Sequence, residues 1–227
     1  MCIKAPRRSE SLRDTLVCAR TAADPMLWPM TDGPLSTPPR SGSRWLGAGY
    51  LGLVGFLVLE ARVREGGHAA SLHASAGDAG TTRAIARAFA LGATLPLLAG
   101  RMPGPRLPQR AAQTGLLLEA GGLLVRAWSM RTLGAAYSRT LRTGETQALV
   151  TDGPYRLVRH PGYLGTLLAW AGFGLTSGNL TVAAVLGALL GRTYARRIDA
   201  EERLLARNLP GYAEYARRSK RLVPFVW

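Results

Sequence analysis

Long uncharged stretches separate arginine-rich segments along this chain. The longest covers residues 161–191 and contains no Asp, Glu, Lys, Arg or His. One helix of that length would rise about 46 Å, more than the roughly 30 Å of a bilayer core, and the middle of the stretch is the turn sequence Ser177-Gly178-Asn179. The pattern therefore predicts a hairpin of two membrane helices rather than one span.

Three earlier blocks also predict helices. They are the uncharged residues 45–59 and 88–100, and residues 111–128, which are interrupted by Glu119 and Arg126. Helices of soluble bundles carry charges every three or four residues on their wet face, and the hairpin carries none. We therefore predict an all-α integral membrane protein with about five transmembrane helices, a C-terminal helical hairpin and a cytosolic C-terminal helix. A soluble all-α bundle is the alternative.

Composition divides the chain into three parts. Residues 1–43 contain many prolines and no apolar run long enough for a signal peptide, so we expect a disordered tail. Residues 44–127 are expected to form the N-terminal membrane helices, and residues 128–227 the functional core. The small-residue stretch 66–82 is expected to be a loop.

The formal charge of the chain is +15, from 29 Lys and Arg against 14 Asp and Glu. The arginines flank the apolar blocks instead of forming a groove with stacking aromatic residues, so we expect no nucleic-acid binding. Basic residues favour the cytoplasmic side of a membrane, which predicts that both ends of the hairpin face the cytosol. Both cysteines lie in the first 18 residues, so neither a disulfide framework nor a cysteine metal site is expected.

Two motifs before the hairpin have explanations other than a ligand site. Residues 47–52 match the dinucleotide pattern G-x-G-x-x-G, but they lie inside an apolar block, which favours helix packing through small residues. His68 and His73 are five residues apart with no third ligand nearby, which favours a solvated loop over a metal pair.

His160 directly precedes the hairpin in the sequence RLVRHPGYLG. Pro161 suits the first turn of a helix, because the N–H that it lacks would be unpaired there. His160 is then expected at a helix N-terminus, where backbone N–H groups favour an anionic ligand group. An interfacial histidine that caps a membrane helix is an equally open alternative.

The helix that leaves the hairpin carries a charged cluster in the sequence RRIDAEERLL. Its apolar positions share one face by their i, i+4 and i+7 spacing, and Glu201 and Glu202 border that face. A carboxylate turned toward an apolar face needs a partner, and Arg197 lies four residues before Glu201. An interfacial helix with ordinary ion pairs is the alternative explanation.

Together these motifs resemble the isoprenylcysteine carboxyl methyltransferase family. The resemblance covers about residues 128–227, through LVTDGPYRLVRHPGYLG, a hairpin with an asparagine at its tip, RRIDAEERLL, Gly211-Tyr212-x-x-Tyr215 and a closing RLVP. Phospholipid N-methyltransferases share the RHPxYxG and paired-glutamate features. The resemblance implies an integral membrane enzyme that uses S-adenosylmethionine, with its active site facing the cytosol. The bias of 27 Arg against 2 Lys suggests a bacterial coding sequence and therefore a bacterial-type cell membrane.

The resemblance also implies particular site residues. Arg197 would face the substrate and orient the acceptor carboxylate, as the catalytic residue. The implied cofactor-binding residues are Gln147, Ala148, Leu149, Val150, Tyr155, His160, Pro161, Gly162, Tyr163, Glu201 and Glu202. The expected partners are membrane lipid and a lipophilic small-molecule or lipidated acceptor, with a carboxylate of isoprenylcysteine type as the preferred methyl acceptor and no metal.

Three other functions stay open at this point. One is a phospholipid or other lipid N-methyltransferase. Another is an NADPH-dependent membrane enone or sterol-type reductase, since such enzymes carry a similar Arg-His-Pro-x-Tyr segment. The third is a non-catalytic membrane protein that keeps the scaffold. The paired Glu201 and Glu202 after Arg197 favour the methyltransferase over the reductase.

Overall fold

The computed structural model describes residues 41–64, 80–134 and 149–223, all within the second of the two units, 1–39 and 40–227, into which the chain divides. The described residues form six α-helices and no β-sheet, which confirms the expected all-α class for this part of the chain. The elements are α1 (Ser41–Arg64), α2 (Thr81–Thr94), η4 (Leu95–Leu98), α3 (Gln109–Leu133), η6 (Gly153–Arg156), α4 (Pro161–Thr176), α5 (Leu180–Asn208) and α6 (Tyr212–Arg218).

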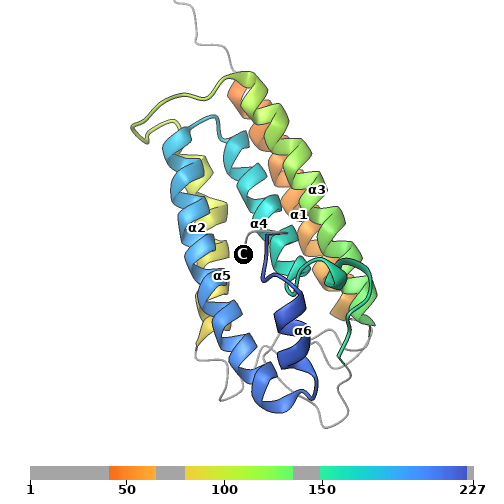
Figure 1. The fold of residues 1–227 in the computed structure, drawn as a ribbon. Helices are drawn as coiled ribbons and strands as arrows, with labels where there is room; N and C mark the ends of the chain where they lie inside the picture. Colours follow the sequence, from red (N-terminus) through yellow and green to blue (C-terminus); the bar gives the residue numbers. More distant parts are fainter. Residues whose placement is uncertain (1–40, 65–79, 135–148, 224–227) are drawn as a thin grey trace, which may run out of the picture. The chain divides into compact units, whose positions relative to one another are not determined.

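Helix α4 is the central helix of this unit. It packs against α3, α5 and α1, while α2 packs against α5 (Figure 1). Aromatic side chains join these helices: Phe89 of α2 and Trp170 of α4 stack with ring centroids 4.8 Å apart, and Tyr50 of α1 meets Phe173 of α4 edge to face at 5.0 Å. The predicted functional motifs therefore lie on helices that the core holds in place.

Helices α3 and α4 approach closely because glycines lie between them. A Cβ atom on Gly122 would lie 2.4 Å from the backbone nitrogen of Ala169 and 2.5 Å from the carbonyl oxygen of Gly165. A Cβ atom on Gly115 would lie 2.6 Å from the carbonyl oxygen of Gly172. Small residues at a helix interface are what allow two backbones to come this near.

The G-x-G-x-x-G motif lies inside α1 and packs that helix against its neighbours. A Cβ atom on Gly49 would lie 2.6 Å from the Thr176 hydroxyl of α4, and one on Gly52 would lie 2.3 Å from a carboxyl oxygen of Glu119 on α3. The helix-packing interpretation of this motif is thus confirmed.

The predicted helical hairpin is also confirmed, with its reversal at residues 177–179 between α4 and α5. Asn179 is buried at the turn and caps α5, because its Oδ1 accepts a hydrogen bond from the N–H of Thr181 at 2.9 Å. Its Nδ2 donates to the carbonyl oxygens of Ala99 and Met102, both at 3.1 Å. One side chain thus starts a helix and fastens the hairpin tip to the segment after η4.

The helices extend beyond the uncharged blocks that predicted them. α1 begins at Ser41 and α2 at Thr81, so the expected tail 1–43 and the expected loop 66–82 each lose their last residues to a helix. Long charged side chains can lie along a helix end and reach a polar layer, so a charge marks the end of an apolar face and not of the helix. Residues 1–40, His68 and His73 lie outside the described residues.

Within the described residues, one helix is long and apolar enough by itself to cross a membrane, over Arg44–Arg62 in α1. Large apolar side chains are nevertheless exposed on several helices of the bundle. They include Leu51, Val54 and Leu57 of α1, Leu91 of α2, Leu117, Leu124 and Trp128 of α3, and Val185 of α5.

Candidate active site

The start of α4 is held by the C-terminal segment of the described chain. The backbone N–H of Arg159 donates to the carbonyl oxygen of Lys220 at 2.7 Å, and that of His160 donates to the carbonyl oxygen of Arg221 at 3.0 Å. Pro161 occupies the first turn of α4, directly after His160, as predicted. His160 occupies the N-cap position of α4, as expected, and its side chain makes no capping hydrogen bond to the helix.

Two motifs that are far apart in the sequence meet across the hairpin. The hydroxyl of Tyr163 donates to Oε2 of Glu201 at 2.6 Å, and Nε2 of His160 lies 3.3 Å from Oε1 of Glu202. The rings of His160 and Tyr163 stack, with centroids 5.5 Å apart and 9° between their planes. Helix α4 thus supplies aromatic side chains and α5 supplies carboxylates to one cluster.

Glu202 is the more firmly held of the two carboxylates. Nε of Arg159 donates to its Oε1 at 2.8 Å, and Nη2 of Arg221 lies 2.9 Å from its Oε2. Burial alone would raise the pKa of the Glu202 carboxyl, but hydrogen bonds from His160 and Arg159 and the Arg159 charge outweigh it and lower the pKa to about 2. Its side chain is 13% exposed against 26% for Glu201, so Glu201 is the more accessible carboxylate.

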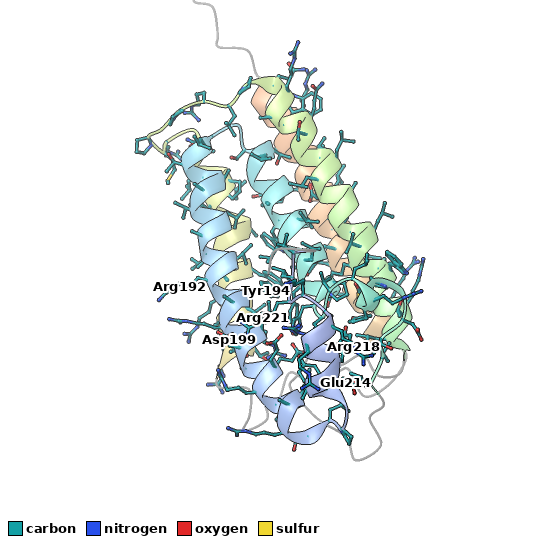
Figure 2. The ribbon with its side chains drawn as sticks, viewed as in Figure 1. Arg192, Tyr194, Asp199, Glu214, Arg218 and Arg221 are labelled. Carbon is teal, nitrogen blue, oxygen red and sulfur yellow. The ribbon has the colours of Figure 1, made fainter. Side chains whose placement is uncertain are left out.

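Arg221 also contacts a second carboxylate of α5. Figure 2 shows it beside Asp199, to which its Nη1 donates at 3.1 Å. Arg192 points away from the bundle in the same view, and Glu214 and Arg218 form an exposed ion pair on α6. The arginines of this region therefore include both fixed members of the site and surface charges.

Arg197 lies one turn before Glu201 on α5 and is only 2% exposed. Its Nε donates to the Tyr163 hydroxyl at 3.2 Å, and its Nη1 donates to the Thr81 hydroxyl at the start of α2 at 2.8 Å. The Tyr163 hydroxyl therefore accepts from Arg197 and donates to Glu201. Arg197 and Glu201 of α5 are therefore linked through the hydroxyl of a tyrosine of α4. Helix spacing alone did not indicate this link.

The remaining predicted cofactor residues precede or begin α4. Tyr155 is buried in η6, and its carbonyl oxygen accepts a hydrogen bond from the Tyr215 hydroxyl of α6 at 2.7 Å. Leu149 and Val150 are half-buried in the segment that leads to η6, and Gly162 lies in the first turn of α4. Outside the described residues lie Gln147 and Ala148.

Sequence reasoning missed Tyr212 as a member of this cluster. Tyr212 begins α6 and is buried, and its hydroxyl has no hydrogen-bond partner among the described residues. Burial, followed by the negative charge of Glu202, raises the pKa of this hydroxyl. A buried polar group without a partner costs about 1–3 kcal/mol, so this hydroxyl favours a polar ligand group beside it.

Sequence reasoning also missed Glu60 and Arg126, which form a buried ion pair between α1 and α3. Each interrupts or borders an apolar block, and that signal was present in the sequence, because charges inside membrane helices are rare and tend to be functional. No group of three or more His, Cys, Asp or Glu side chains suited to a metal ion occurs within the part of the chain that the structure describes.

Part of this chain is similar to known proteins. Residues 116–207 match the model of the isoprenylcysteine carboxyl methyltransferase family. The cobalt-zinc-cadmium resistance protein CzcN of Cupriavidus metallidurans is 40% identical over 110 residues, 48% of this chain and 50% of that protein. Protein-S-isoprenylcysteine O-methyltransferase A of Arabidopsis thaliana is 32% identical over 127 residues, 55% of this chain and 64% of that enzyme.

A solved structure of a eukaryotic intramembrane Ras methyltransferase, isoprenylcysteine carboxyl methyltransferase, matches with a TM-score of 0.50 and 19% identity over 64% of this chain and 52% of that chain. At this identity the likeness concerns the fold. The chain spans about half the length of the metal-resistance protein and of the solved chain, 50% and 52% respectively.

Proposed function

This chain belongs, through residues 116–207, to the isoprenylcysteine carboxyl methyltransferase family, and on that premise we propose that it transfers a methyl group from S-adenosylmethionine to a lipophilic acceptor at the membrane–cytosol boundary. A carboxylate of isoprenylcysteine type is the preferred acceptor. Phospholipid or other lipid N-methylation is the second choice within the same chemistry.

The observation that carries this proposal is the meeting of the two family motifs. Tyr163 of α4 connects Glu201 and Arg197 of α5 through one hydroxyl, at 2.6 Å and 3.2 Å. A carboxylate that can hold a donor molecule and a guanidinium that can hold an acceptor carboxylate are therefore fixed one helical turn apart.

The residues present fit S-adenosylmethionine, which supplies an electrophilic methyl group on a sulfonium when it is bound. The molecule also has an amine, a carboxylate, a ribose and an adenine. Glu201 and the unpartnered hydroxyl of Tyr212 suit its amine and hydroxyl groups, and the start of α4 suits its carboxylate. The buried rings of Tyr155 and Tyr212 suit the wall of an adenine pocket.

The chemistry requires little more than alignment from this chain. Transfer from a sulfonium to a carboxylate neutralises charge, so it needs exclusion of water and a correct approach more than an acid or a base. Arg197 would bind the acceptor carboxylate through paired N–H groups, and the hydroxyls of Tyr163 and Thr81 hold its guanidinium in orientation. The His160 and Glu202 pair would keep the start of α4 against α5.

A membrane location is supported by the exposed apolar side chains of α1 and α3 and by the candidate span Arg44–Arg62. We propose that α4 and the first half of α5 cross the bilayer as a hairpin. The arginines that follow residue 191 favour a cytosolic face for the site.

The first test is isothermal titration calorimetry of the purified chain with S-adenosylhomocysteine and with NADPH. Binding of S-adenosylhomocysteine alone supports the methyltransferase, and binding of NADPH alone would replace it with the reductase. Binding of neither would indicate a scaffold without catalysis.

The second test separates the two members of the Tyr163 link. Glu201→Gln should weaken S-adenosylhomocysteine binding about tenfold or more, since a hydrogen bond to a charged group contributes about 1.5–3 kcal/mol. Arg197→Lys keeps the charge but loses the planar fork, so cofactor affinity should hold while methyl transfer falls. Equal losses in both variants that follow the melting temperature would leave only a structural role for these residues.

A further inference from the structure

The ion pair of Glu60 and Arg126 lies inside the bundle, between α1 and α3. The two residues are 9% and 7% exposed, and Nε of Arg126 donates to Oε1 of Glu60 at 2.6 Å. The guanidinium also lies 5.1 Å from the centre of the Phe56 ring. An ion pair in such surroundings is costly to bury, which calls for an explanation beyond the packing of two helices.

Arg126 has a second set of contacts, on α4. Its Nη1 donates to the carbonyl oxygen of Gly162 at 3.0 Å and to the hydroxyl of Thr166 at 2.6 Å. The Thr166 hydroxyl in turn donates to the same Gly162 carbonyl oxygen at 3.0 Å. The guanidinium thus donates hydrogen bonds to the backbone of the first turn of α4 and to one side chain of the next turn.

The Gly162 carbonyl lies between His160, which directly precedes α4, and Tyr163 of α4, and both of these side chains contact carboxylates of α5. His160 is two residues before Gly162 and Tyr163 is one residue after it, so a shift of this turn moves both rings relative to Glu201 and Glu202. A Cβ atom on Gly162 would lie 3.7 Å from Cβ of Ser129, so the turn also rests on α3 directly.

We infer that Glu60 and Arg126 are positioning residues that set the first turn of α4 for binding of the methyl donor. This inference rests on the proposed function. Arg126 lies within the matched residues 116–207 and Glu60 lies before them, so the pair makes α1 part of the functional unit as well as a membrane helix.

A double substitution distinguishes a positioning role of this ion pair from a purely structural role. Replacing a buried ion pair with apolar residues of similar volume is often neutral for stability. Glu60→Met/Arg126→Met should therefore keep the melting temperature within a few degrees of the wild type, while the hold on the Gly162 carbonyl is lost. A positioning role predicts a fall in affinity per folded molecule, and a structural role predicts none.

The experiment measures S-adenosylhomocysteine affinity by calorimetry, well below the melting temperature of each variant. We expect the double variant to bind about tenfold or more weakly than the wild type. Glu214→Gln/Arg218→Gln, which removes the exposed ion pair of α6, is the matched control and should bind normally. Unchanged affinity in Glu60→Met/Arg126→Met would overturn the inference, and the proposed function would survive it.

Arg126→Lys gives a second, milder test if the double variant does not fold. Lysine keeps the charge opposite Glu60 but cannot direct separate N–H groups to Glu60 and to the Gly162 carbonyl in a fixed plane. We expect a threefold to tenfold loss of affinity at near-normal stability, and normal affinity would overturn the inference. A wild-type chain that binds no S-adenosylhomocysteine would overturn the proposed function and this inference together.

Discussion

The contact between α3 and α4 predicts opposite effects of the same substitution at two adjacent glycines. A Cβ atom on Gly122 would lie 2.4–2.9 Å from backbone atoms of Gly165 and Ala169, whereas one on Gly121 meets nothing within 4 Å. Ordinary contacts begin near 3.4 Å, so Gly122→Ala must push the helices apart by about 1 Å. Because the opposing atoms are backbone, no side chain can turn aside to relieve this.

The cost can be estimated from typical values. Overpacking of a tight interface costs about 1–3 kcal/mol, and the backbone contact places Gly122→Ala at the upper end. Alanine gains up to about 1 kcal/mol over glycine in helix propensity, which leaves a net loss of about 2 kcal/mol. Since 1 kcal/mol shifts Tm by about 2–4 °C in a chain of this size, Gly122→Ala should melt about 4–8 °C lower. Gly121→Ala should melt at or above the wild-type temperature.

The assay is thermal unfolding in detergent micelles, followed by the far-ultraviolet circular dichroism of the helices. Both variants add one methyl group to the same turn of α3, so Gly121→Ala controls for propensity and for detergent effects. Equal melting temperatures for the two variants would refute the close approach of α3 and α4. Gly122→Ala should also weaken S-adenosylhomocysteine binding, since the displaced helix carries His160 and Tyr163.

Three further outcomes follow from single side chains. Glu202→Gln should remove a stabilisation that depends on pH. The pKa of the Glu202 carboxyl is lowered from 4.5 in the unfolded chain to about 2 in the folded chain, which stabilises the fold by about 3 kcal/mol above pH 4.5. This stabilisation is lost as the pH falls from about 4.5 to 2. The Tm difference between wild type and variant should therefore shrink across that window, and a constant difference would contradict the assignment. Asn179→Ala should cost about 1–2 kcal/mol through loss of the α5 cap alone, and Asn179→Asp should not recover stability in the same melting assay, because its carboxylate would face the carbonyl oxygens of Ala99 and Met102. Tyr212→Phe should keep or raise Tm because it removes an unpartnered buried hydroxyl, yet it should weaken S-adenosylhomocysteine binding in calorimetry; normal binding would remove Tyr212 from the proposed cofactor site.

The hairpin was predictable because two independent signals agreed on it. Residues 161–191 lack charges, which indicates burial or lipid, and Ser177-Gly178-Asn179 in their middle indicates a reversal. Proline after His160 likewise fixed the start of α4, since proline suits only the first turn. Residues that are close together in the sequence determine each of these features, and the packing of the helices does not alter them.

Contacts between helices were less predictable. Helix spacing related Arg197 to Glu201 along α5, but the Tyr163 hydroxyl that connects them comes from α4 and the Thr81 hydroxyl from α2. The backbone N–H groups of Arg159 and His160 donate to the carbonyl oxygens of Lys220 and Arg221, and bonds between backbone atoms leave no trace in the residue types. Such contacts depend on how helices pack, and periodicity along one helix does not contain that information.

The start of α4 is fixed by contacts of a different kind from those that face the proposed ligands. Glycine packing on α3, the Gly162 carbonyl bonded to Arg126 and the backbone pairing with residues 220–221 involve atoms that a small ligand does not replace. The bond from the Tyr163 hydroxyl to Glu201, in contrast, can exchange for a bond from a ligand amine to Glu201 of similar strength, while the hydroxyls of Tyr163 and Thr81 stay on the Arg197 guanidinium. A charged methyl donor can then bind by exchanging a hydrogen bond while the backbone of the site stays in place, which keeps the cost of reorganisation low.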